Sequence, residues 1–148
     1  MNQNAEDEAA AGAAASAGAA ARATCDVSTL RGTYLFADQG VNVTGFRRVP
    51  IAGAGYDYFD GNGKIEGILT SNINATITSR DSYSGSYTVN PDCTGRSTFP
   101  ATRATPEYQY DLYIHPEGDM FTWVQVKPER SEVVSAVEQR VTLKRIRN

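Results

Sequence analysis

Short runs of alternating hydrophobic and polar residues fill the chain from about residue 30 onward. Alternation with a period of two is typical of β-strands that bury one face. The runs predict strands at 32–38, 51–60, 64–71, 74–80, 84–90, 95–102, 108–115, 121–127 and 134–146. Val and Ile outnumber Leu, which favours strands, and no segment keeps a helical period over three turns. The pattern therefore predicts an all-β protein.

Turn-forming residues separate nearly all of these runs. The sharpest hairpin signal is Asp60-Gly61-Asn62-Gly63, because Gly and Asn accept positive φ angles. Further turns are predicted at 81–82, 90–92 and 116–119, and a longer loop at 40–50. Successive hairpins build an antiparallel meander, and closing about eight strands into a single barrel removes the unpaired edges. A sandwich of two sheets is the alternative architecture.

The alternation also predicts which side chains face inward. In 108–115, the more apolar face, expected inside, holds Tyr108, Tyr110, Leu112 and Ile114. Two other strands have balanced faces. In 121–127, either Phe121 and Trp123 line the interior, or the residues on the other face do, namely Met120, Thr122, Val124 and Val126. Likewise, either Asp57 with Phe59 or Tyr56 with Tyr58 points inward.

Composition divides the chain at residue 24. Residues 1–24 hold 12 alanines and no aromatic residue, and they carry three acids and one base. Such a segment cannot bury enough apolar surface to dock, so we expect a disordered tail or a frayed helix before a barrel domain at 25–148. The whole chain has a formal net charge of −3. Most of that charge lies in the tail, and a nearly neutral body disfavours nucleic acid and membrane insertion. The sequence does not indicate an oligomer.

The two cysteines, Cys25 and Cys93, lie at the start of the body and in a turn-like segment near its middle. Metal and redox sites usually place cysteines close together or add histidines. A disulfide between these two residues fits better, and it would indicate an oxidising compartment, either extracellular or periplasmic. Two unrelated buried thiols are the alternative.

Three stretches of the body also form a recurring signature: Cys25 with 30–34, Phe59-Asp60-Gly61-Asn62-Gly63 with Gly67, and 85–95, which ends in Cys93-Thr94-Gly95. The signature resembles small secreted bacterial proteins of uncharacterised function, which in turn resemble the allene oxide cyclase-type, lipocalin-like barrel. The resemblance covers roughly residues 25–146. It implies a barrel that binds small apolar molecules or isomerises or cyclises them without a cofactor, and it assigns no catalytic residue.

Aromatic residues are the most suggestive candidates for a site. Tyrosine and tryptophan can line a cavity for a flat or apolar molecule and supply hydrogen bonds to it. The predicted ligand-binding residues are Tyr56, Tyr58, Phe59, Tyr108, Trp123, Glu138 and Arg140. If the protein is an enzyme, Asp57 and Tyr110 are the candidate acid–base residues, because a carboxyl in an apolar cavity has a raised pKa.

Each of these predictions has a plainer alternative. In the plainer alternative, the tyrosines simply fill a small barrel, which serves as a structural or interaction module. Glu138 and Arg140 form an ordinary ion pair if they lie outside. His115, the only histidine, is expected at the surface, so we predict no metal site and no cofactor. Asp60-Gly61-Asn62-Gly63 lacks the spacing of a calcium loop and is expected to be a hairpin turn.

Overall fold

A computed structural model describes residues 24–45 and 47–142 of the chain. The predicted alanine-rich tail therefore lies, apart from residue 24, outside the described residues. Within the described ranges there is one three-residue 3-10 turn, η1 (Val27–Thr29), and no α-helix. None of the described helical structure has the length and apolar character needed to cross a membrane.

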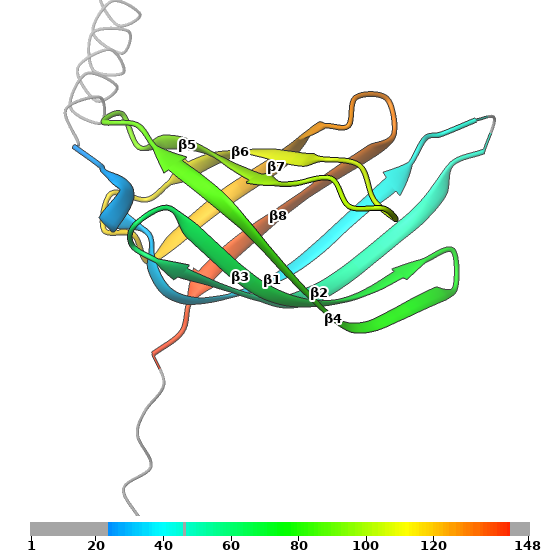
Figure 1. Cartoon of the computed structure of the whole chain (residues 1–148), viewed down its shortest axis with the longest axis horizontal. Coiled ribbons are helices and arrows are strands. Elements are labelled where there is room, and N and C mark those ends of the chain that lie inside the picture. The colour runs from blue at the N-terminus through cyan, green and yellow to red at the C-terminus, as the bar shows by residue number, and fades with distance from the viewer. Residues whose placement is uncertain (1–23, 46, 143–148) are drawn as a thin grey trace, which may run out of the picture.

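Eight antiparallel strands form a closed barrel (Figure 1). Each strand pairs with the next along the chain, and β8 pairs with β1 to close the sheet. The strands are β1 (Arg31–Asn42), β2 (Val49–Asp60), β3 (Lys64–Ile73), β4 (Thr76–Val89), β5 (Thr94–Phe99), β6 (Tyr108–Ile114), β7 (Met120–Lys127) and β8 (Glu132–Arg140). The closed barrel predicted from the alternation is confirmed, and the two-sheet alternative is wrong.

One predicted turn is absent. Segments 74–80 and 84–90 were expected to be separate strands, but they form the single strand β4. The pairing of β3 with β4 shifts register between Leu69 and Ser71, and Arg80 takes a positive φ of 53° there. The irregularity therefore falls at residues 79–80, next to the predicted turn, and forms a bulge that bends the sheet without ending the strand.

The two ends of the barrel differ. At one end, on the left of Figure 1, η1 and the hairpins after β2, β4 and β6 come together; we call this the sealed end. Its interior is filled by aromatic rings in edge-to-face contact: Tyr34, Phe59, Tyr87 and Phe121. At the other end, the open end, the hairpins between β1 and β2 and between β3 and β4 extend beyond the barrel.

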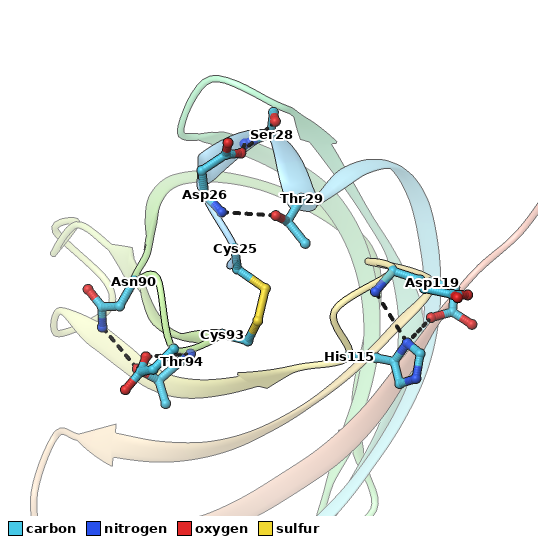
Figure 2. The surroundings of a disulfide bond; sticks show 11 residues. Cys25, Asp26, Ser28, Thr29, Asn90, Cys93, Thr94, His115 and Asp119 are labelled. Atoms are coloured by element: carbon cyan, nitrogen blue, oxygen red, sulfur yellow. Dashed lines mark hydrogen bonds and ion pairs between the residues drawn. A yellow bond between two sulfur atoms is a disulfide. The ribbon is translucent and has the colours of Figure 1, made fainter. Parts of the chain in front are cut away.

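The disulfide between Cys25 and Cys93 is confirmed, which rules out the alternative of two free thiols. It joins the segment before η1 to the turn between β4 and β5 (Figure 2), with a Cα–Cα distance of 5.0 Å. The Tyr87 hydroxyl shares its single hydrogen between the carbonyl oxygens of Val27 and Leu30, each 2.9 Å from its oxygen. Covalent and hydrogen bonds thus hold η1 over the sealed end.

The hairpin at Asp60-Gly61-Asn62-Gly63 is confirmed as the connection between β2 and β3. The Asp60 carboxylate accepts from the backbone amides of Asn62 at 2.7 Å and Lys64 at 3.0 Å. Gly61 and Gly63 have φ angles of 80° and 103°, which residues with a Cβ rarely adopt. Both bonds end on Oδ1 of Asp60 and hold the hairpin turn in place.

Candidate functional site

The structure resolves which strand faces point inward. Tyr108, Tyr110, Leu112 and Ile114 face the interior as predicted, whereas Tyr113 is exposed. On β7 the inward residues are Phe121 and Trp123.

On β2 the inward residues are Asp57 and Phe59, so Tyr56 and Tyr58 lie outside with 40% and 46% of their surface exposed. The expectation that Tyr56 and Tyr58 line the interior beside Tyr108 and Tyr110 is wrong. Alternation allows only one face of β2 to point inward.

Carboxyl groups are concentrated inside the barrel. Asp57 and Glu138 are 6% and 2% exposed, and Asp38 and Glu132 lie half-buried on the inward faces of β1 and β8. In contrast, every Lys, Arg and His in the described ranges is exposed. The interior therefore contains acids without a basic side chain to neutralise them.

Asp57 and Glu138 meet in the middle of the barrel, where four side chains interact. The Tyr83 hydroxyl donates to Asp57 Oδ1, and Trp123 Nε1 donates to Glu138 Oε1 at 2.8 Å. Because an indole N–H can only donate, Oε1 must be the accepting oxygen of Glu138. Its other oxygen, Oε2, has no well-aligned partner and is the atom that can carry a proton toward Asp57.

This arrangement raises the pKa of both carboxyl groups. Burial raises the pKa of Asp57 from 3.8 to about 6, although hydrogen bonds from Tyr83 and Glu138 work against the increase. Burial also raises the pKa of Glu138 well above 4.5, and the neighbouring charge of Asp57 adds to the effect. Two adjacent carboxyls in an apolar site titrate as a unit. Burial and the proximity of the two groups therefore both disfavour the state in which Asp57 and Glu138 are ionised together.

A glycine on the intervening strand allows Tyr83 to reach Asp57. Gly67 of β3 pairs with Asp57 of β2 on one side and with Tyr83 of β4 on the other. A Cβ on Gly67 would overlap Asp57 Oδ1 and would lie 2.5 Å from Tyr83 Cζ and 2.6 Å from its hydroxyl oxygen. Only a residue without a side chain leaves room for the tyrosine to cross β3.

A second polar layer lies toward the open end, where the inward side chains are partly exposed to solvent. Asp38 Oδ1 and Gln125 Nε2 are buried atoms without a well-aligned hydrogen-bond partner. Burial raises the pKa of Asp38 and that of Glu132, while an interaction with Gln125 lowers the latter. The ring of Tyr110 stacks on Tyr108, with centroids 6.5 Å apart.

Tyr110 connects this layer to the central network. Its ring contacts the edge of Trp123, with a centroid distance of 4.8 Å. Its pKa is raised first by burial and then by the charges of Glu132, Tyr108, Asp38 and Asp57. These carboxyl groups lie on β8, β1 and β2, and Tyr110 lies on the inward face of β6.

The other predicted site residues are dispersed. Phe59 is packed against Tyr34, Tyr87 and Phe121 in the sealed end, where it is 1% exposed. Arg140 is exposed at the same end and donates to the backbone carbonyls of Glu117 and Arg31. The described residues contain no ion pair between Arg140 and Glu138, because Glu138 points inward and hydrogen-bonds to Trp123.

Two shallow hollows lie on the outer surface. One, of about 480 Å³, is lined by Tyr56 and Tyr58 together with residues of β3 and β4, among them Gly67 and Tyr83. The other, of about 340 Å³, lies over β4, β5 and β6 beside the ion pair of Arg96 with Asp111. Both hollows face solvent. The interior, in contrast, is filled with side chains at the sealed end and lined by polar and aromatic groups toward the open end.

His115 is exposed, as expected, and its Nδ1 lies 2.8 Å from Asp119 Oδ1 (Figure 2). Glu117 also lies close, so that the ligand-type atoms of these three residues are within 4.8 Å of one another. The sequence analysis considered His115 alone and did not consider these two carboxylates beside it. The three side chains are exposed, and we assign no metal site to them.

Sequence reasoning missed Tyr83, Asp38 and Glu132 as interior groups. Tyr83 shares the alternating face of Gly85 and Tyr87, but the predicted turn at 81–82 placed it outside any strand. Asp38 follows Tyr34 and Phe36 on the buried face of β1, which was a usable signal. The missed residues supply the hydroxyl that binds Asp57 and the carboxyls of the open end.

Comparison with known proteins gives the fold alone. The sequence matches no protein-family model and no curated protein. The structure is similar to the solved structure of EF1p2_mFAP2b bound to DFHBI, with a TM-score of 0.51 and 15% sequence identity. The match covers 82% of this chain and 98% of that chain. At this identity the similarity concerns the fold, and the fold of this chain is the closed barrel described above.

Proposed function

We propose that this protein binds a small apolar or aromatic molecule at the open end of its barrel. The observation that supports this most directly is the contrast between the two ends. The sealed end is closed by packed rings and a disulfide, whereas the open end presents partly exposed inward residues. Tyr108 and Tyr110 supply stacked aromatic surface there, and Asp38 supplies an unpaired polar atom. Aromatic walls with a few polar groups are typical of small-molecule sites.

The barrel similarity agrees with this proposal, since the neighbouring structure is bound to DFHBI. The disulfide fits a protein that folds in an oxidising compartment, and we propose that the protein is secreted or periplasmic. The plainer alternative, a filled barrel that serves as a structural or interaction module, is supported by the packed sealed end but not by the open end.

The proposal can be tested with the neutral fluorophore N-phenyl-1-naphthylamine, whose emission increases in apolar sites. The full chain should enhance its emission, and Tyr108→Ala should weaken binding at least fivefold because a ring at the open end is lost. Tyr56→Ala is the matched control, since Tyr56 is a strand tyrosine on the outer face. Native mass spectrometry of the purified protein would reveal a ligand that co-purifies. Absence of both signals, or equal effects of the two variants, would contradict the proposal.

A second candidate function is a cofactor-independent isomerase or cyclase, of the kind found in allene oxide cyclase-type barrels. The pKa of Asp57, raised to about 6, favours it, because an acid or base works best when its pKa lies near the working pH. Tyr83 would orient the carboxylate through its hydrogen bond. Cyclisation of an allene oxide generated in situ should then be lost in Asp57→Asn and kept in Glu66→Gln, an acid on the outer face. Equal product distributions with and without protein would exclude this candidate.

A further inference from the structure

We propose that the free edge of β4 binds an extended peptide without net charge as an added strand, with apolar side chains of the peptide in the hollow beside Tyr56 and Tyr58. This surface lies on the outer wall of the barrel, so it is a second binding site besides the open end. β4 begins at Thr76, whereas β5 pairs only with residues 86–89 of it. The two strands diverge toward the right of Figure 1. Among the described residues, none pairs its backbone with residues 76–85 on the side away from β3.

The alternation of β4 shows which backbone groups are free. In an antiparallel strand, the N–H and C=O groups of successive residues point to opposite neighbours. The Tyr87 N–H donates to the carbonyl of Gly63, on the β3 side, at 2.9 Å. The backbone groups of Ser82, Ser84 and Ser86 therefore point to the other side, and Ser86 is the last residue that pairs with β5. Ser82 and Ser84 are exposed, and their backbone donors and acceptors have no strand partner in the described part of the chain.

The free edge is regular only over a short length. β4 stays in continuous register with β3 from Ser86 to Asp81, and the register shifts beyond Asp81, where Arg80 has a positive φ of 53°. A bulge of this kind interrupts further pairing along an edge. The edge therefore accepts a short strand and resists the open-ended stacking of many chains.

The hollow of about 480 Å³ lies beside this edge on the outer face, and its lining includes Tyr56, Tyr58, Ile68, Ser82 and Ser84. The register places Ile68 of β3 between Tyr56 of β2 and Ser82 of β4. Large rings thus stand on one side of the hollow and small hydroxymethyl groups on the other. Neighbouring strands lie about 4.8 Å apart, and aromatic or long side chains reach beyond the directly opposite residue. An apolar side chain opposite Ser82 or Ser84 can therefore pass over the serine and pack against the rings.

An extended peptide suits this surface better than a second copy of the chain. If two β4 edges paired, the free backbone groups of both copies would belong to Ser82 and Ser84. Serine would then face serine, and nothing would fill the hollow. The short edge alone also supplies far less than the roughly 800 Å² that each partner buries in a stable interface.

The charges beside the edge are balanced. Lys64 contacts Glu66 at 2.8 Å, and Arg80 and Asp81 are neighbours in the chain. A peptide with a net charge would find no compensating group here, so the surface favours one without net charge. Main-chain hydrogen bonds supply the affinity for an added strand, and pockets for its alternate side chains supply the specificity.

The probe is the peptide Lys-Thr-Phe-Thr-Leu-Thr-Glu, acetylated and amidated at its ends, whose phenylalanine and leucine share one face of an extended strand. Residues opposite Ser82 and Ser84 turn their side chains to the outer face and their backbone groups to β4. Methylation of the backbone nitrogens of phenylalanine and leucine should therefore weaken binding to the full chain by about tenfold or more in calorimetry. Methylation of the nitrogens of the two threonines that precede them removes donors that point away from β4. It should change the affinity by less than about twofold.

Variants of the protein test the same contacts. Ser84→Pro removes a free N–H from the edge and should abolish binding of the unmethylated peptide, whereas Ser84→Ala keeps the backbone and should retain it. Tyr58→Ala should weaken binding about fivefold because a ring beside the hollow is lost. Tyr113→Ala, which removes an exposed tyrosine from the other hollow, is the matched control. Proline is tolerated on edge strands, and urea unfolding followed by Trp123 emission checks the fold of each variant. If Ser84→Pro does not fold, the two methylated peptides with the wild type decide the question.

Absence of binding by the unmethylated peptide, or equal weakening by the two methylation patterns, would overturn the proposal. A dimer in sedimentation equilibrium that Ser84→Pro converts to a monomer would also overturn it, because the edge would then bind a second copy. N-phenyl-1-naphthylamine should bind Ser84→Pro as it binds the wild type. The outcome for the edge is therefore separate from the outcome for the open end.

Discussion

Replacing Glu138 by glutamine is expected to make the stability of the barrel less dependent on pH. Burial, together with the charge of nearby Asp57, raises the pKa of Glu138 in the folded protein well above its ordinary value. In the unfolded chain the same group ionises near 4.5. The folded state therefore binds more protons than the unfolded state above that pH, and its stability falls as the pH rises. Glutamine keeps the oxygen that accepts from Trp123 but has no proton to lose.

The size of the effect follows from the pKa of the pair. For Asp57 the pKa increases from 3.8 to about 6, and one pKa unit corresponds to about 1.4 kcal/mol. Asp57 alone should thus remove about 3 kcal/mol of stability between pH 4 and pH 7. Glu138 should remove at most about 1.4 kcal/mol of further stability per pH unit. This loss applies over the pH range in which the group is protonated in the folded chain but ionised in the unfolded chain. Asp38 and Glu132, whose pKa values are also raised, contribute with the same sign.

Other carboxyls act with the opposite sign but at lower pH. Hydrogen bonds lower the pKa of Asp26, Asp60 and Asp92 below 3.8. Their contribution is complete above the unfolded pKa and is lost only as the pH falls through the folded value. Between pH 5 and pH 8, the slope of the unfolding free energy against pH should therefore be set by the interior acids. Maximum stability is expected near pH 4 to 5.

Urea unfolding, followed by the emission of Trp123 with the disulfide intact, measures the free energy of unfolding at pH 5, 6, 7 and 8. The wild type should lose stability with rising pH, and Glu138→Gln should lose it less steeply and be at least as stable at pH 8. Glu66→Gln should keep the wild-type slope, since its ion pair with Lys64 is exposed and contributes less than about 1 kcal/mol. A wild-type stability that is constant or rises from pH 5 to pH 8 would refute the reasoning, as would equal slopes in wild type and Glu138→Gln.

Three further outcomes are expected. Reduction of the Cys25–Cys93 bond should lower the free energy of unfolding by about 4 kcal/mol, because the bond closes a loop of 68 residues; a urea midpoint that does not change on reduction would contradict this. Gly67→Ala should destabilise the barrel by about 3 kcal/mol, since its methyl group would displace Tyr83 from Asp57; unfolding curves that match the wild type would show that the strand can yield. Tyr83→Phe should raise the pKa of Asp57 above its value of about 6, because the hydroxyl that favours the carboxylate is removed; a carbon-13 titration of the Asp57 carboxyl measures this, and an equal or lower pKa would count against the hydrogen bond.

Much of the fold was predictable because it depends on local patterns. The alternation in 108–115 determined that Leu112 and Ile114 face the core, and the turn chemistry of Gly61 and Gly63 determined the hairpin after β2. The prediction was wrong at 81–82 because polar residues favour a turn and a bulge alike. In β4, pairing with the neighbouring strand β3 decided between a turn and a bulge, and a local pattern in β4 does not contain that information.

By itself, the sequence determined that the body is a series of short strands joined by turns, and it favoured a disulfide between Cys25 and Cys93. The tertiary structure alone decided that Asp57 points inward and Tyr56 outward, because a pattern of period two with balanced faces fits either orientation. It also decided that Asp57 and Glu138 meet. Closure of β8 onto β1 brings together residues that are distant in the chain, and no local pattern encodes that register. The burial that raises the pKa of both carboxyls exists only once the barrel is closed.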